Sequence, residues 1–140
     1  LRAVGALTLS MLGTDVSAAS LVVAERKGLY SETLAIDLKQ KFPFADDRFV
    51  AAISAGVFTY LGNPEPVLQE LLRVVRPTGV IIFSQRTDLW EMFDCGAIIQ
   101  RLFDAGLCEA DVSTAQPYLQ NHPEYGDTIQ VIYTTLTVLD

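Results

Sequence analysis

Two carboxylates, Asp15 and Asp37, follow the ends of expected strands, and they are the side chains of this sequence best placed to bind a ligand. A doubly wound sheet binds its ligands at the carboxyl ends of its strands. An acidic side chain at that edge accepts hydrogen bonds from ribose hydroxyls or from the amino group of adenine. The pair therefore indicates a site for a ligand that contains a nucleoside. The alternative interpretation is that each aspartate only caps a strand end.

The elements that must position these carboxylates alternate between apolar runs and helical patterns, which is typical of parallel strands joined by crossover helices. In the N-terminal part, Ser17 is placed to cap a helix and Gly28 to stop it. Asn63-Pro64 begins a later helix, whose apolar residues recur at helical spacing. We expect strands at 7–12, 34–36, 49–54, 80–83, 107–112 and 128–138, and helices at 18–27, from Asn63-Pro64 to Val75, and at 92–105.

This order of elements predicts an α/β fold: a three-layer, mostly parallel doubly wound sheet with an antiparallel C-terminal strand. The strand 49–54 is nearly continuous in apolar residues, so we expect it to be buried on both faces. No linker is long enough to divide the chain, and residues 1–140 are predicted to form one domain.

Five segments carry a resemblance to a known family: GTDVS at 13–17, KGLY at 27–30, DL at 37–38, FVAAISAGVFTYL at 49–61 and LLRVVRPTGVIIFS at 71–84. In this order and spacing the sequence resembles the class I S-adenosylmethionine-dependent methyltransferases, in particular those related to the Williams–Beuren-region methyltransferase-like proteins. The family's first strand and its G-x-G-x-G cofactor loop have no counterpart here, so the sequence looks like a truncated Rossmann-like methyltransferase domain. Thr78 also departs from the family's Pro-Gly-Gly turn, with Gly79 left to take a positive φ.

The resemblance implies S-adenosylmethionine as the cofactor and assigns a role to each matching residue. Asp15 would hold the ribose hydroxyls and Val16 would press on the adenine face. Asp37 would accept the adenine amino group, with help from the backbone of Leu38. The methionine end would be lined by Ser54, Ala55 and Gly56. No catalytic side chain and no metal ligand is predicted, and the missing loop predicts weak or absent cofactor binding.

Composition excludes several other functions. The formal net charge of -7 argues against nucleic acid as a partner, and no segment has the roughly 20 apolar residues of a membrane span. Cys95 and Cys108 lack metal-site spacing and are predicted to be buried thiols in a reducing, cytoplasmic setting. His122 is expected at the surface. The aromatic residues Trp90, Phe93 and Phe103 are interpreted as packing residues.

Two functions remain open. The chain is either part of an enzyme that methylates a small molecule, or a non-catalytic methyltransferase-fold remnant that acts as a dimeric binding or scaffold module. Without the family's first strand, two strand edges that are normally interior become exposed. These edges could pair directly, be covered by a shifted N-terminal run, or be covered by a second copy. We expect a closed-up sheet and a homodimer.

Overall fold

The computed structural model describes residues 10–119, 121, 123 and 128–140, which form two compact units. The N-terminal unit comprises residues 1–42 and the C-terminal unit residues 43–140. His122 and residues 7–9 of the first predicted strand lie outside the described residues. Each unit is described by itself.

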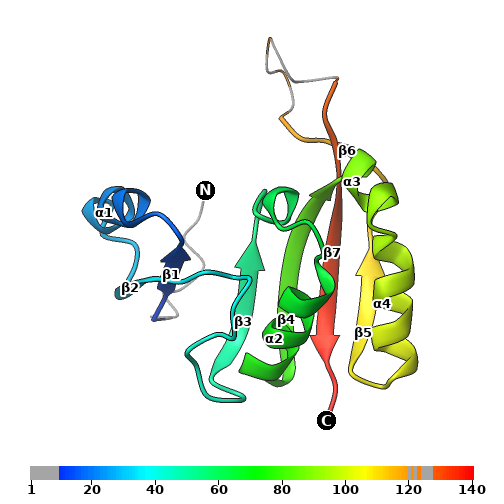
Figure 1. Cartoon of the computed structure of the whole chain (residues 1–140), viewed down its shortest axis with the longest axis horizontal. Helices are drawn as coiled ribbons and strands as arrows, with labels where there is room; N and C mark the ends of the chain where they lie inside the picture. Colours follow the sequence, from blue (N-terminus) through cyan, green and yellow to red (C-terminus); the bar gives the residue numbers. More distant parts are fainter. Residues whose placement is uncertain (1–9, 120, 122, 124–127) are drawn as a thin grey trace, which may run out of the picture. The chain divides into compact units, whose positions relative to one another are not determined.

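The N-terminal unit is a strand, a helix and a parallel strand (Figure 1). The strands β1 (Leu12–Asp15) and β2 (Glu32–Ala35) flank α1 (Ala18–Arg26). Ser17 caps α1, because its hydroxyl accepts a hydrogen bond from the Ser20 amide at 3.3 Å. The helix ends as predicted before Gly28, which has a φ of 64°. The first strand starts later than predicted.

Gly13 lies within β1 rather than after it, and contact with an aromatic ring explains the glycine. A Cβ at this position would stand 2.9 Å from the Cδ1 atom of Tyr30. The ring can therefore pack directly on the strand backbone. The predicted strand stops at residue 12, before Gly13, whereas in the structure Gly13 lies within β1 and leaves space for Tyr30.

The C-terminal unit is built on a second sheet of order β3-β4-β7-β5, with the short β6 paired to β7. Its elements are β3 (Phe49–Ser54), η1 (Phe58–Tyr60), α2 (Glu65–Val74), β4 (Val75–Arg86), α3 (Thr87–Met92), α4 (Cys95–Asp104), β5 (Cys108–Val112), β6 (Gln116–Pro117) and β7 (Gln130–Val138). The strands β3 and β4 are parallel neighbours, and β7 runs antiparallel to both β4 and β5. The predicted α/β class and the antiparallel last strand are confirmed.

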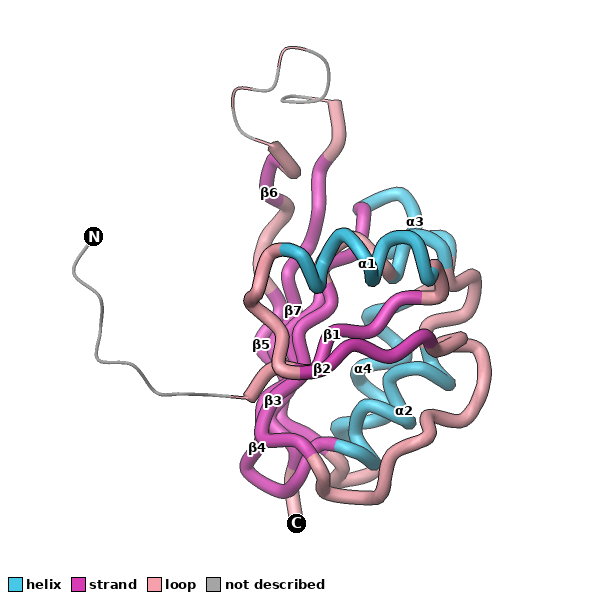
Figure 2. Tube along the Cα trace, turned by 90° about the vertical axis from the view of Figure 1, so that its left-hand side faces the viewer, coloured by secondary structure: helices cyan, strands magenta, loops and turns pink. Residues whose placement is uncertain are grey.

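The helices of this unit lie on one side of its sheet (Figure 2). They cover the buried sheet residues Ile81, Phe83 and Leu136. Beneath η1 the ring of Phe58 stacks on Phe83, with 4.5 Å between ring centroids. One predicted helix is wrong in its extent: residues 92–105 are interrupted at Asp94, whose φ is 50°, so that α3 ends before α4 begins.

Parts of the other face of this sheet are exposed, which corrects the expectation that strand 49–54 is buried on both faces. Ile53 is 77% exposed on β3 and Tyr133 is 42% exposed on β7. The structure also has two separate sheets rather than the closed-up sheet that was expected, because β1 pairs with β2 and β3 pairs with β4. In the described residues, β3 has one unpaired edge.

Candidate functional site

The two predicted carboxylates lie at the same end of the N-terminal sheet. Asp15 is the last residue of β1, and Asp37 follows the neighbouring β2 by two residues. The strands are parallel and in register, with Asp15 opposite Ala35, and the Ile36 amide donates to the Asp15 carbonyl oxygen at 3.0 Å. Both carboxylates therefore follow the carboxyl ends of their strands, and the pairing of β1 with β2 makes those strands neighbours.

Each carboxylate uses one oxygen to fix the turn that follows its strand. The Oδ1 atom of Asp15 accepts from the Ser17 amide at 2.8 Å, and the Oδ1 atom of Asp37 accepts from the Lys39 amide at 2.9 Å. Both side chains are exposed, and within the described part of the chain neither Oδ2 atom has a hydrogen-bond partner. Each aspartate is thus oriented by the backbone and still has an acceptor for a ligand.

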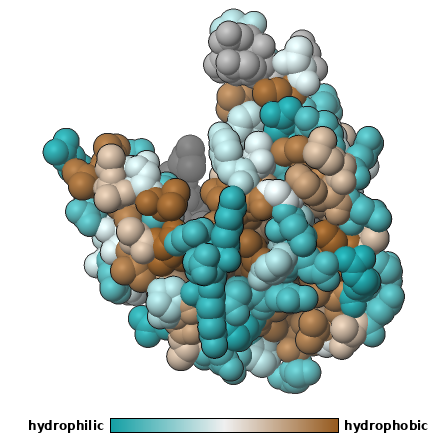
Figure 3. Space-filling model, viewed as in Figure 1, coloured by the Kyte–Doolittle hydropathy of each residue, from teal (hydrophilic) through white to brown (hydrophobic). Residues whose placement is uncertain are grey.

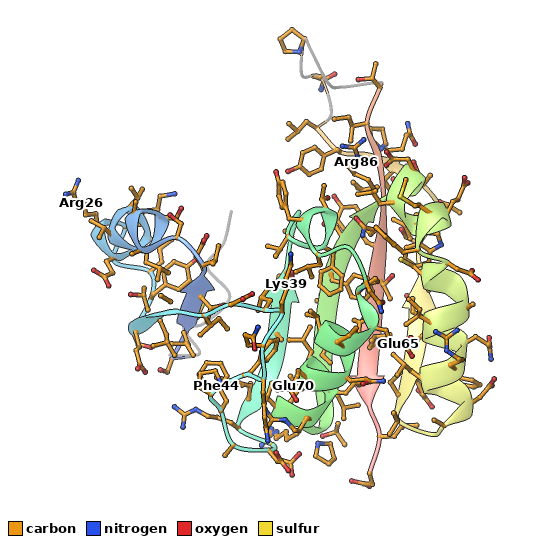
Figure 4. The ribbon with its side chains drawn as sticks, viewed as in Figure 1. Arg26, Lys39, Phe44, Glu65, Glu70 and Arg86 are labelled. Carbon is orange, nitrogen blue, oxygen red and sulfur yellow. The ribbon has the colours of Figure 1, made fainter. Side chains whose placement is uncertain are left out.

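The two apolar residues beside these carboxylates differ in exposure. Val16 is 76% exposed directly after β1, while Leu38 is half-buried after β2. An exposed branched side chain next to an acceptor carboxylate suits the flat face of a base. Lys39, labelled in Figure 4, follows Leu38 in the chain.

The other three predicted residues, Ser54, Ala55 and Gly56, belong to the C-terminal unit, where β3 ends. Gly56 has a φ of 75°, and its amide donates to the Oγ atom of Ser84 at 3.0 Å. That bond ties the turn after β3 to the neighbouring β4. The Oγ atom of Ser54 is buried without a hydrogen-bond partner in the described part of the chain. Ser54 pairs with Phe83, so it shares the face that the helices cover.

A pocket of about 150 Å³ opens beside Gly56. Two of its walls are Tyr60 from η1 and Tyr118 after β6, and the hydroxyl of Tyr118 is 3.5 Å from where a Cβ on Gly56 would stand. Sequence reasoning missed this pocket because its walls come from segments far apart in the chain. The described residues that line it are Gly56, Thr59, Tyr60, Ser84, Arg86, Tyr118, Ile129 and Val131.

Two polar side chains of this pocket come from β4. Ser84 is buried, and its Oγ atom accepts from the Gly56 amide; among the described residues its own hydrogen has no acceptor, so it can be donated to a ligand. Arg86, labelled in Figure 4, holds Asp88 through two hydrogen bonds of 3.0 Å and 2.7 Å. Arg86 lowers the pKa of the Asp88 carboxyl through these bonds. Because the Arg86 guanidinium is paired with Asp88, it adds little net charge to the pocket and acts there mainly as a hydrogen-bond donor.

The sequence and structure of this chain match known proteins in two comparisons. Residues 1–83 match the family described as "Methyltransferase domain". No curated protein matches the chain. Among solved structures, an S-adenosylmethionine-dependent methyltransferase from Thermotoga maritima aligns with a TM-score of 0.63 at 17% identity, over 91% of this chain and 72% of its own.

Two further structures align over similar lengths. One from Methanosarcina mazei, also described as an S-adenosylmethionine-dependent methyltransferase, has a TM-score of 0.68 at 13% identity and covers 94% of this chain and 83% of its own. The N-methyltransferase NodS from Bradyrhizobium japonicum has a TM-score of 0.66 at 17% identity, with coverages of 94% and 74%. At these identities the structural likeness shows a shared Rossmann-like fold.

Proposed function

Because this chain belongs to the methyltransferase domain family, we propose that it derives from an enzyme that transfers a methyl group from S-adenosylmethionine to a small molecule, and that this 140-residue chain binds the cofactor weakly or not at all. The observation that carries the proposal is the pair of oriented carboxylates, Asp15 and Asp37, each with one oxygen that has no hydrogen-bond partner among the described residues. Family resemblance supports S-adenosylmethionine as the cofactor.

The residues of the N-terminal unit fit the nucleoside part of that cofactor. The Oδ2 atom of Asp15 suits the ribose hydroxyls, and that of Asp37 suits an adenine amino group, because both are acceptors and both groups are donors. Val16 offers an exposed apolar surface to the base, with the backbone of Leu38 beside Asp37. What S-adenosylmethionine supplies when bound is an electrophilic methyl group.

In the C-terminal unit, Ser54, Ala55 and Gly56 are proposed to contact the methionine end, and the adjoining pocket is proposed to hold the methyl acceptor. Gly56 has no side chain, so its backbone lies open between Ser84 and Tyr118. The Ser84 hydroxyl can donate a hydrogen bond to the methyl acceptor, and the rings of Tyr60 and Tyr118 can hold that molecule in place. The contribution of these residues to rate is positioning, which needs no nucleophilic side chain.

Weak binding follows from what the two carboxylates lack. The given sequence contains no G-x-G-x-G loop whose backbone could approach the cofactor closely. Isothermal titration of S-adenosylmethionine into the 140-residue chain tests this, with Asp15→Ala and Asp37→Ala as variants and Asp47→Asn as a control on an exposed turn. Weak binding that either alanine variant abolishes supports the proposal. Binding unaffected by both variants contradicts the assigned site, and micromolar binding by the parent chain contradicts the proposed impairment.

The second candidate function is a non-catalytic dimeric module in the cytoplasm, and the open edge of β3 favours it. Ile53 and Val50 on this strand are 77% and 47% exposed, and an unpaired apolar edge is a template for association. A stable dimer buries roughly 1,200–2,000 Å². Light scattering at micromolar concentration should give twice the 15.4 kDa mass, and Ile53→Lys should return it to that mass. A monodisperse 15.4 kDa parent chain contradicts the dimer.

None of the helices in the described part of the chain is long and apolar enough to cross a membrane.

A further inference from the structure

A groove lined mostly by apolar residues, with Gln100 as its polar member, runs along β5 in the C-terminal unit. Its volume is about 370 Å³, and its walls come from α3, α4 and β5. Phe103 on α4 is 50% exposed and Val112 on β5 is 42% exposed, so the groove presents apolar side chains to solvent. Phe103 and Val112 therefore lie outside the core, whereas Ile99 on α4 is buried at 5% exposure. Figure 3 shows hydrophobic surface among hydrophilic residues on the face of this unit that α3 and α4 cover.

The strand beside this groove is the last of its sheet. The strand order places β5 next to β7 alone, so in the described part of the chain its other edge is unpaired. The Ser113 amide donates to the Tyr133 carbonyl at 2.9 Å, and the Leu139 amide donates to the Leu107 carbonyl at 3.0 Å. These contacts define the alternation of an antiparallel ladder.

In an antiparallel ladder, every second residue of a strand exchanges backbone hydrogen bonds with the partner strand. Since residues 107 and 113 of this chain bond to β7, residues 109 and 111 between them do so as well. The amide and carbonyl groups of Cys108, Ala110 and Val112 therefore face the unpaired edge. This edge can accept one more strand without breaking a bond to β7.

The two faces of β5 differ in chemistry. Ala110 and Val112 pair with the buried residues Leu136 and Thr134, so their side chains lie on the face of the groove. Glu109 and Asp111 alternate with them and project from the opposite face, where both are exposed. A strand laid along this edge would meet an apolar groove on one face and two carboxylates on the other.

We propose that β5 and its groove bind an extended peptide strand that alternates apolar with basic residues. The backbone edge supplies hydrogen bonds, the groove receives the apolar side chains, and Glu109 and Asp111 pair with the basic ones. The formal net charge of -7 favours approach of a basic partner. This surface is independent of the proposed methyl transfer.

A second copy of the chain fits the edge poorly. Antiparallel pairing of two β5 strands about a two-fold axis keeps like faces together, so Glu109 and Asp111 of one copy would face the same carboxylates of the other. Like charges directly opposite each other destabilise a strand pair. The charge pattern therefore selects a basic strand over self-pairing.

The test uses seven-residue acetylated peptides that alternate lysine with valine or leucine, compared with the same peptides carrying glutamate in place of lysine. Trp90 is the single tryptophan of the chain and lines the groove, so its emission reports binding directly. We expect saturable binding of the lysine peptide with a change in Trp90 emission, and affinity about tenfold lower for the glutamate peptide. Equal affinities, no saturation, or saturation without an emission change would each overturn the proposal.

Matched variants separate the edge from the charges. Ala110→Pro removes an outward amide that β7 does not use and should abolish binding, while Ala110→Ser keeps the amide and should bind as the parent does. Glu109→Gln with Asp111→Asn should weaken lysine-peptide binding, whereas the same charge change in Glu32→Gln with Asp47→Asn should not. Circular dichroism of each variant checks its folding. Parent-like binding by folded Ala110→Pro contradicts the proposal, and a parent dimer that Ala110→Pro dissociates would assign the edge to a second copy.

Discussion

Replacing Thr78 by glycine should stabilise the C-terminal unit. Thr78 has a φ of 64°, in the left-handed region that a β-branched residue rarely adopts. Its side chain is exposed in the first part of β4, where the register with β3 is irregular. The expectation from sequence that Gly79 takes the positive φ is wrong, because the left-handed residue is Thr78 itself.

Gly79 is needed for a different reason. A Cβ on Gly79 would stand 2.5 Å from a side-chain carbon of Val75, and 2.7 Å and 2.8 Å from the carbonyl oxygens of Arg76 and Val50. Backbone oxygens cannot move aside as a flexible side chain can. Gly79→Ala should therefore destabilise the unit.

The magnitude follows from two opposing terms. A left-handed residue with a Cβ costs about 1–2 kcal/mol, and glycine costs about 0.5–1 kcal/mol in lost chain entropy. Thr78→Gly should then raise the free energy of unfolding by about 0.5–1 kcal/mol. For a unit of this size, that corresponds to a rise in Tm of about 2–8 °C.

The assay is thermal unfolding followed by circular dichroism, with Thr78→Ala as the matched control. Alanine keeps the Cβ and so keeps most of the strain, which means it should leave the Tm near that of the parent. A Tm for Thr78→Gly at or below that of Thr78→Ala would refute the reasoning. An unchanged Tm for Gly79→Ala would refute the close contacts.

Three further outcomes are expected. Phe58→Ala should lower the free energy of unfolding by about 3–5 kcal/mol in urea titration, because the buried ring stacks on Phe83. The control Phe58→Leu should lower it clearly less. Equal losses for the two variants would argue against the stacking. Burial, with the Asp94 charge adding to it, raises the pKa of the Cys95 thiol to about 11, and burial also raises the pKa of Cys108. A disulfide reagent at pH 8 should therefore label both thiols slowly in the folded chain and rapidly in guanidinium, and one fast folded-state thiol would contradict this. The unfolded thiols lose their protons at about pH 8.5, whereas the folded Cys95 keeps its proton up to its raised pKa. The free energy of unfolding should therefore fall as pH rises from about 8.5 through the folded pKa of Cys95. A denaturation midpoint that does not fall between pH 8 and 11 would count against this linkage.

The strands were predictable where apolar residues run without interruption. Residues 49–54 form β3 with the predicted bounds, and 80–83 lies within β4 as its parallel neighbour. Both segments are rich in the branched and aromatic residues that favour strands. Their adjacency follows from the helix α2 between them, which returns the chain to the same sheet.

The errors occurred where no glycine or proline marks a break, or where a tertiary contact decides local structure. The break between α3 and α4 lies at Asp94 in a left-handed conformation, with no glycine or proline at the break. Gly13 belongs to β1 because Tyr30 packs on it. The exposure of Ile53 depends on which neighbours β3 has, and that is not a property of the strand's own residues.

The candidate site was predictable as residue types at strand ends, and not as a pocket. Asp15 and Asp37 precede turns that their own side chains stabilise, so the local sequence determines their geometry. The pocket beside Gly56 needs Tyr118, which is brought there by the pairing of β6 with β7. No residue spacing in the sequence indicates that Tyr118 lies beside Gly56.

The N-terminal unit holds its two carboxylates with little apolar packing. Among the described residues of this unit, the buried apolar side chains are Leu21, Ile36 and Phe42. At about 1.5–3 kcal/mol each, they contribute much less than the cost of ordering the backbone, which is about 1–2 kcal/mol per residue. Hydrogen bonds from the Ser17 and Lys39 amides therefore take a large part in orienting Asp15 and Asp37.

A ligand at 100 times its Kd adds about 2.7 kcal/mol of stability. On that scale, a nucleoside ligand that bridges both aspartates would stabilise this unit about as much as one of its core side chains does, so its binding and the unit's local unfolding form a single coupled equilibrium.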